Sequence, residues 1–229
     1  MKIYLSIIIS LFIGFYSNSQ KSANQEIKPF EKLVLIGNFT THIINSDNNL
    51  AVATSHGDEA NIDNLEFSYK NKTLTIKYQG SFVKEIPLQL TLNYNKPIAS
   101  IEARRGVILT VESAGNFDEP VKYYAENGSK VLINQVYADF VEAHITKGGS
   151  IRINGEAKNF QPRINAGGTI ASVSLKTKHV IAKVSMGGEI ICAPIETLDA
   201  TIFSGGSINY KGSPKVTESI TFGGKIEQL

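Results

Sequence analysis

Cysteine is nearly absent from this sequence, and so is any strong bias of charge. The single cysteine among 229 residues cannot form a disulfide within the chain, and with four histidines it supplies no zinc-finger pattern. The 23 basic residues against 21 acidic residues leave a net charge of +2, without the surplus that nucleic-acid-binding proteins carry. We therefore expect a fold that is stabilised by packing alone and has no nucleic acid as partner.

A hydrophobic run long enough to span a membrane is also missing. The apolar stretch from Ile3 to Tyr16 is 14 residues, whereas a membrane-spanning helix needs about 20. Lys2 before it and Ser17-Asn18-Ser19 after it are typical of a secretory signal peptide, which we predict for residues 1–19. A buried helix is the alternative, but the stretch lacks amphipathic spacing. No cysteine follows the stretch to carry a lipid anchor, so we expect an exported protein, periplasmic or extracellular, with no transmembrane segment in the mature chain.

An internal repeat dominates the second half of the chain. Five Gly-Gly pairs are each followed by one residue and then isoleucine, and their first glycines are 19, 20, 18 and 18 residues apart. Shorter glycine turns at Asn127-Gly128 and Arg105-Gly106 extend the pattern toward the N-terminus. The five copies are Gly148-Gly149-Ser150-Ile151, Gly167-Gly168-Thr169-Ile170, Gly187-Gly188-Glu189-Ile190, Gly205-Gly206-Ser207-Ile208 and Gly223-Gly224-Lys225-Ile226.

Two columns of β-branched residues accompany the glycines. One is the isoleucine after each pair, and the other lies three residues before it: Ile145, Ile164, Val184, Ile202 and Ile220. Such columns predict strands that stack with these side chains inward, and the glycines turn each corner at positive φ. The fold class is therefore predicted to be an all-β, right-handed single-stranded parallel β-helix, or solenoid, with rungs of about 18–20 residues.

The N-terminal half is less regular but rich in strands. Alternating apolar residues predict strands at 33–35, 74–78 and 88–92, and a short one at 50–53. The polar segments 156–159, 176–178 and 211–214 are expected to be surface loops between strands. With no linker composition after the signal, we predict a single domain over residues 28–229.

Catalytic signatures are missing from the sequence. No Ser-His-Asp order, phosphate loop or dinucleotide fingerprint occurs, so no catalytic, metal or cofactor-binding residue is assigned and no cofactor is expected. Asp139 and Glu142 could begin a glycosidase pair, but one rung further on the chain has Lys158 and Gln161 instead of acids. Arg104 and Arg105 beside Glu102 could hold an acidic sugar, although solvated surface arginines are the commoner case.

Three aromatic residues are the candidates for facing a ligand: Tyr123, Tyr124 and Phe203. Tyr123 and Tyr124 are adjacent, so one of them must point outward if they lie in a strand. Phe203 lies in a column that is otherwise polar, which indicates an exposed ring. Cys192 aligns with Ile153 and Tyr210 and is expected to be an inward apolar position rather than a reactive thiol.

The serial Gly-Gly rungs, the strand pair around residues 74–92 and Phe30-Glu31-Lys32-Leu33 resemble the putative auto-transporter adhesin, head GIN domain family. The resemblance covers nearly the whole mature chain. It implies an exported right-handed parallel β-helix with an adhesin label, and it brings no catalytic motif with it. Many members of that family are lipoproteins, and this sequence departs from them in having no lipid-anchor cysteine.

Two classes of function remain open at this level. The first is a non-catalytic exported β-helical protein, an adhesin or a surface or periplasmic binding module for a glycan or an envelope protein. The second is a polysaccharide lyase or hydrolase on the same scaffold. The last Gly-Gly pair is followed by only five residues, so we also expect self-association through the C-terminal rung or coverage of that rung by another part of the chain.

Overall fold

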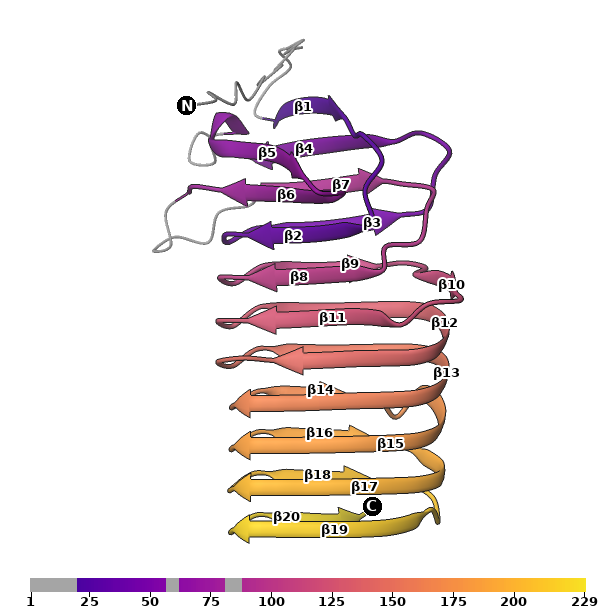
Figure 1. The fold of residues 1–229 in the computed structure, drawn as a ribbon. Helices are drawn as coiled ribbons and strands as arrows, with labels where there is room; N and C mark the ends of the chain where they lie inside the picture. Colours follow the sequence, from indigo (N-terminus) through magenta and orange to yellow (C-terminus); the bar gives the residue numbers. More distant parts are fainter. Residues whose placement is uncertain (1–19, 57–61, 81–87) are drawn as a thin grey trace, which may run out of the picture.

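The computed structural model describes residues 20–56, 62–80 and 88–229, and the predicted signal peptide lies outside this part of the chain. The described residues form an elongated all-β solenoid (Figure 1), and their only helix is the 3-10 turn η1. The elements are β1 (Gln20–Glu26), β2 (Lys32–Ile36), β3 (Thr40–Ile44), β4 (Leu50–His56), η1 (Ile62–Asn64), β5 (Leu65–Lys70), β6 (Thr73–Tyr78), β7 (Leu88–Asn93), β8 (Ser100–Arg104), β9 (Ile108–Val111), β10 (Gly115–Phe117), β11 (Val121–Glu126), β12 (Lys130–Ile145), β13 (Ser150–Ala166), β14 (Thr169–Ala171), β15 (Leu175–Met186), β16 (Glu189–Cys192), β17 (Pro194–Ser204), β18 (Ser207–Tyr210), β19 (Lys215–Phe222) and β20 (Lys225–Gln228).

The solenoid is flattened into two sheets that share one core. The front sheet, which faces the viewer in Figure 1, contains β5, β6, β2, β8, β11, the second halves of β12 and β13, and then β15, β17 and β19. The back sheet contains β1, β4, β7, β3, β9, the first halves of β12 and β13, and then β14, β16, β18 and β20. In space, every rung from β6–β7 through β2–β3 and β8–β9 to β19–β20 stacks on the next in parallel, which confirms the predicted fold class.

The glycine repeat makes one corner of each rung, as predicted. At Gly167-Gly168, for example, φ is +62° and +107°, values that side-chain-bearing residues rarely adopt. Both predicted columns are inward: Ile164 in the front sheet and Ile170 in the back sheet are fully buried, as are their counterparts through the rung of β17 and β18. In the earliest copy the inward residue is Leu109, because Ile108 lies opposite Lys130 and is exposed.

The opposite corner differs from the prediction. Segments 156–159 and 176–178 were expected to be loops, but they lie within the continuous strands β13 and β15 and keep parallel partners on the next rung. These segments are polar because every second residue faces solvent. The residues that alternate with them, such as Ala157 in β13 and Thr177 in β15, are buried. Only the predicted loop at 211–214 has no regular structure.

Antiparallel strands close the N-terminal end of the solenoid. Rung β2–β3 lies between β6–β7 and β8–β9, so the spatial order of the rungs differs from their order in the chain. The outer edges of β6 and β7 are paired with the antiparallel strands β5 and β4, and β1 then pairs with β4. Strand β1 precedes the predicted domain start at residue 28, and its polar sequence, QKSANQE, gave no strand signal.

The rung of β19 and β20 is the outermost described rung at the other end. Its inward residues lose the cover that a further rung gives elsewhere, so Ile220 is 43% exposed although Ile202 above it is fully buried. Glu218 lies opposite buried Ala200 and therefore occupies an inward register position. An inward charge at a sheet edge opposes the stacking of another strand on it. Self-association through this rung stays a prediction.

Candidate functional site

The two adjacent tyrosines lie on opposite faces of β11. Tyr123 is fully buried between the sheets, and burial raises the pKa of its hydroxyl above the ordinary value of a tyrosine. Tyr124 points out of the front sheet and packs against the ring of His144, with ring centroids 5.8 Å apart. Because its side chain does not reach the surface, Tyr123 is removed from the candidates for facing a ligand, whereas Tyr124 keeps that position.

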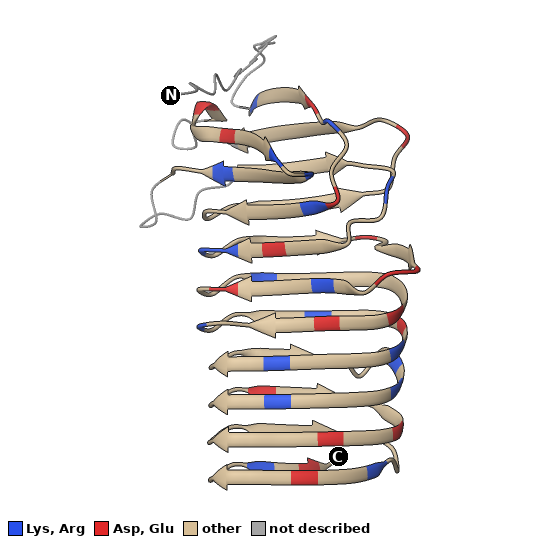
Figure 2. Ribbon diagram, viewed as in Figure 1, with Lys and Arg blue, Asp and Glu red and all other residues tan. Residues whose placement is uncertain are grey.

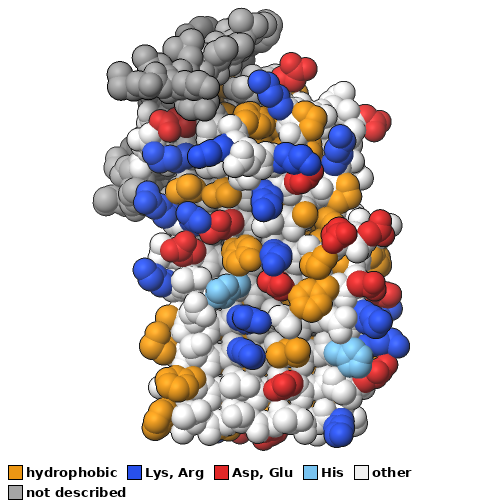
Figure 3. All heavy atoms as spheres, viewed as in Figure 1, with side chains coloured by type: hydrophobic (Ala, Val, Ile, Leu, Met, Phe, Trp, Pro, Cys, Tyr) orange, Lys and Arg blue, Asp and Glu red, His pale blue; other side chains and the backbone are white. Residues whose placement is uncertain are grey.

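The third candidate, Phe203, lies at the Gly-Gly corner and is 52% exposed. It packs edge-on against Phe222 on the next rung, with ring centroids 5.7 Å apart. Met186, one rung earlier, is exposed as well. These three side chains form a small apolar strip at the corner, where Figure 3 shows hydrophobic side chains at the left edge of the lower rungs.

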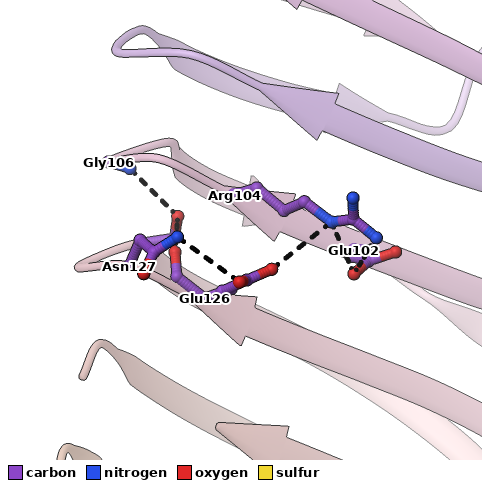
Figure 4. Close-up of polar contacts among 6 residues, drawn as sticks. Glu102, Arg104, Gly106, Glu126 and Asn127 are labelled. Carbon is purple, nitrogen blue, oxygen red and sulfur yellow. Dashed lines mark hydrogen bonds and ion pairs between the residues drawn. The ribbon is translucent and has the colours of Figure 1, made fainter. Parts of the chain in front are cut away.

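The arginine pair does not form a free anion site. Arg104 on β8 contacts Glu102 at 2.7 Å and Glu126 on β11 at 3.5 Å (Figure 4), and its hydrogen bond with Glu102 raises the pKa of its guanidinium. Arg105 turns the chain at φ +63°. The charge of Arg104 is therefore already matched by two carboxylates of the protein.

Cys192 and the candidate carboxylates give no sign of chemistry. Cys192 is buried inside the back sheet, as expected, and burial raises the pKa of its thiol to about 12. Among residues 20–56, 62–80 and 88–229, no group of three histidine, cysteine or acidic side chains could hold a metal ion. The register also places Gln161, not an acid, opposite Glu142.

A groove lies at the corner opposite the glycines, where β12 and β13 bend from the back sheet into the front sheet and β15 begins. Its volume is about 480 Å³. The register shifts there, because Asn134 and Gln135 of β12 stand opposite the single residue Asn154 of β13. This extra residue is a β-bulge, which bends a strand and changes the direction of its side chains. The groove is lined by Glu112, Asn134, Gln135, Tyr137, Asn154, Gly155, Glu156, Ser174 and Lys176.

The bulge brings an exposed aromatic ring beside a row of amides. Tyr137 is 45% exposed, and the amide of Asn154 donates to the amide oxygen of Asn134 across the rungs at 2.8 Å. Glu156 follows Tyr137 on the next rung and contacts Lys176 at 2.8 Å, which raises the pKa of Lys176 through this hydrogen bond and the charge of Glu156. A flat ring with amide, carboxylate and ammonium groups around it can stack on one face of a sugar and hydrogen-bond its hydroxyls.

Gly155 makes this arrangement possible. Its φ is +139°, and a Cβ atom there would lie 2.0 Å from the carbonyl oxygen of Val136 on the rung above. Only glycine allows the bent strand to approach β12 so closely. The sequence analysis did not predict the groove. A signal was present, because Gly128 and Gly148 are 20 residues apart, one more than Gly148 and Gly167, and the bulge lies within this longer interval.

The fold and these surfaces define an all-β solenoid that presents polar and aromatic side chains on a rigid scaffold. Residues 29–214 match the family model described as putative auto-transporter adhesin, head GIN domain, and the chain belongs to this family. The resemblance inferred from the glycine rungs is thereby confirmed.

Several solved structures have a related fold. A putative adhesin from Bacteroides fragilis superposes with a TM-score of 0.81 at 19% identity, covering 93% of this chain and 98% of that one. A putative adhesin from Parabacteroides merdae gives 0.68 at 16% identity, covering 93% and 97%. A putative lipid binding protein from Parabacteroides distasonis gives 0.67 at 17% identity, covering 93% and 97%.

A search of curated proteins found no match. Within the part of the chain that the structure describes, no helix has the length and apolar character needed to cross a membrane.

Proposed function

We propose that this chain is an exported, non-catalytic recognition protein that binds a glycan in the groove at the corner opposite the glycines. The observation that carries the proposal is the exposed ring of Tyr137 beside the paired amides of Asn134 and Asn154. Solvent-exposed aromatic rings flanked by hydrogen-bonding side chains are suited to sugars, which have an apolar face and a polar edge. The adhesin family and the predicted signal peptide support a role outside the cytoplasm.

The absence of catalysis is part of the proposal. Glycoside cleavage needs two carboxyl groups across the scissile bond, one of them protonated. The groove has the carboxyl groups of Glu112 and Glu156, and Glu156 is matched by the ammonium group of Lys176 at 2.8 Å. The carboxylate of Glu156 is therefore already engaged by a cation of the protein, and its oxygens can accept hydrogen bonds from sugar hydroxyls.

The test is binding of residues 20–229 to an array of host and bacterial glycans, followed by titration of any hit. Tyr137→Ala should weaken binding roughly two- to tenfold, because stacking on an aromatic ring is worth about 0.5–1.5 kcal/mol. Asn154→Ala should also weaken binding. Phe203→Ala is the matched control, because it removes an exposed ring far from the groove.

Two results would overturn the proposal. One is an array without any saturable hit. The other is binding that Tyr137→Ala leaves unchanged. Release of new reducing ends from a bound glycan, abolished by Glu112→Gln, would replace the binding function with the alternative of a polysaccharide-processing enzyme.

A further inference from the structure

The front sheet has a column of basic side chains that the groove does not explain. His144 of β12 pairs in register with Arg163 of β13, and Arg163 pairs with Lys183 of β15. All three occupy outward positions, and Arg163 and Lys183 are exposed. Because the strands of a sheet lie about 4.8 Å apart, the three basic groups are stacked at close spacing along the solenoid axis. We call these residues the basic column.

Stacked like charges are unusual in this molecule. Several charged neighbours on successive rungs instead pair with opposite sign, as in Lys122–Glu142 at 3.2 Å, Lys176–Glu156 at 2.8 Å and Arg104–Glu126 at 3.5 Å. Lys158 and Lys178 are a second pair of like charges in register, but Lys178 contacts Glu196 at 3.1 Å. In Figure 2 the basic bands of β13 and β15 instead lie one above the other in the front sheet. Like charges directly opposite each other on neighbouring strands destabilise a sheet, so the column costs stability.

No carboxylate in the described part of the chain offsets this cost. Arg163 donates to the neutral side chain of Gln161 at 3.0 Å, and Lys183 makes no ion pair with another described residue. Of the two nearest acidic positions in the register, Glu142 contacts Lys122, and Asp199 lies diagonally from Lys183 without contacting it. Among residues 20–56, 62–80 and 88–229, the column therefore has no counter-charge in contact with Arg163 or Lys183.

The surroundings of the basic column suit a polar polymer. Tyr124 packs on His144 at the N-terminal end of the column and adds an aromatic surface. Asn165 and Ser185 flank it with an amide and a hydroxyl, two residues along the same strands. In Figure 3 basic side chains lie one above another on this face, with hydrophobic and acidic side chains beside them.

We propose that the basic column binds an acidic polysaccharide that lies along the solenoid axis, with anionic groups on successive sugars contacting Arg163 and Lys183. A sugar in an extended polymer advances by a distance close to the spacing between rungs, so successive anionic groups match successive strands. The column is a second surface, separate from the groove: His144 follows Tyr137 by seven residues on β12, or roughly 23 Å of extended strand.

The experiment titrates residues 20–229 with polygalacturonate, with dextran sulfate and with neutral dextran. We expect one or both acidic polymers to bind and dextran not to bind, with affinity falling as salt is raised. The double variant Arg163→Gln/Lys183→Gln should bind roughly three- to twentyfold more weakly. The polymer that binds identifies the anionic group as carboxylate or sulfate.

The matched control is Arg152→Gln/Lys130→Gln, which removes the same charges from exposed positions of the back sheet. It should keep the affinity of the unmodified chain. The proposal is overturned if neither acidic polymer binds, if the front-sheet variant binds as well as the unmodified chain, or if both double variants lose affinity equally. Thermal unfolding checks the fold, and the front-sheet variant should be at least as stable because a repulsion has been removed.

The proposal for the groove and the proposal for the basic column can be disproved independently of each other. Tyr137→Ala should leave binding of the acidic polymer unchanged, and Arg163→Gln/Lys183→Gln should leave binding of a neutral glycan in the groove unchanged. If Tyr137→Ala abolishes binding of both, the basic column is not an independent site.

Discussion

The two glycines of one corner should respond very differently to the same small substitution. Gly167 has φ +62° and open space where a Cβ atom would be, whereas Gly168 has φ +107° and would place a Cβ 2.7 Å from the carbonyl oxygen of Gly149 and 2.9 Å from Cγ2 of Ile145. That carbonyl accepts a hydrogen bond from the backbone of Thr169 at 3.1 Å, so it cannot move away freely. Alanine scanning of this pair therefore tests the close stacking of the rungs.

The expected magnitudes follow from these contacts. Gly167→Ala costs about 1–2 kcal/mol for the left-handed backbone, and about 0.4–1 kcal/mol is recovered because alanine restricts the unfolded chain. The net loss is about 1 kcal/mol. Gly168→Ala costs about 1–3 kcal/mol in backbone strain and about 1 kcal/mol in a weakened hydrogen bond, so we expect a loss of about 2–4 kcal/mol in total.

Urea denaturation followed by circular dichroism measures the difference, provided that the slope against urea is the same in both variants. Because a solenoid can unfold rung by rung, hydrogen exchange at the amides of β13 and β14 should report the same order of stability locally. Equal destabilisation by the two substitutions would refute the reasoning, because the backbone conformation alone would then account for both glycines.

Three further predictions concern single side chains. Burial raises the pKa of the Cys192 thiol to about 12, against about 8.5 in the unfolded chain, so the contribution of the buried thiol to the free energy of unfolding is present below pH 8.5 and declines as the pH rises toward 12. Cys192→Ala should remove that part of the pH dependence of stability. Rapid alkylation of the native thiol at pH 8 would contradict the burial. Phe203→Ser should lower stability by no more than about 1 kcal/mol, the worth of its contact with Phe222, and loss of cooperative unfolding would show that the ring is not outward. Glu218→Leu should increase self-association in light scattering at neutral pH by removing the inward charge from the outermost rung, whereas a monomer at all concentrations would show that Glu218 does not control stacking.

The regular part of the fold could be predicted because a local signal sets it. Each Gly-Gly pair determines a corner, and the isoleucine after it and the β-branched residue before it determine which face is inward. The register of successive rungs then follows from the spacing of the glycines. This reasoning also placed Cys192 inside and Phe203 outside.

The N-terminal half could not be ordered in the same way, because its pairings are not local. The rung of β2 and β3 is separated in the chain from β8 and β9 by the strands that stack on its other side. The alternation of apolar and polar residues around Leu33 and Leu74 indicates that each lies in a strand. It does not indicate which other strand pairs with it. The polar strand β1 was missed because its partner β4, rather than its own sequence, holds it in an extended form.

The candidate sites depend on contacts between rungs, which cannot be read from the composition of the sequence. Tyr123 is buried because its column contains Ala143 on the next rung, and a small neighbour leaves room for a large ring. The groove depends on one extra residue in β12, and the basic column depends on an exact register across three strands. In each case the decisive fact is which residue lies one rung away, and the sequence gives it only where the repeat is uninterrupted.

The separation of inward and outward columns explains how one scaffold can present different surfaces. Inward positions keep the same kind of residue from rung to rung, because each must pack on the one above it, so they carry no information about a ligand. Outward positions are free to vary, and several charged ones pair with an opposite charge on the next rung. The outward features that cost stability are the strained bulge beside Tyr137 and the repulsion between Arg163 and Lys183. Because packing does not require either of them, both features support the proposed binding of glycans.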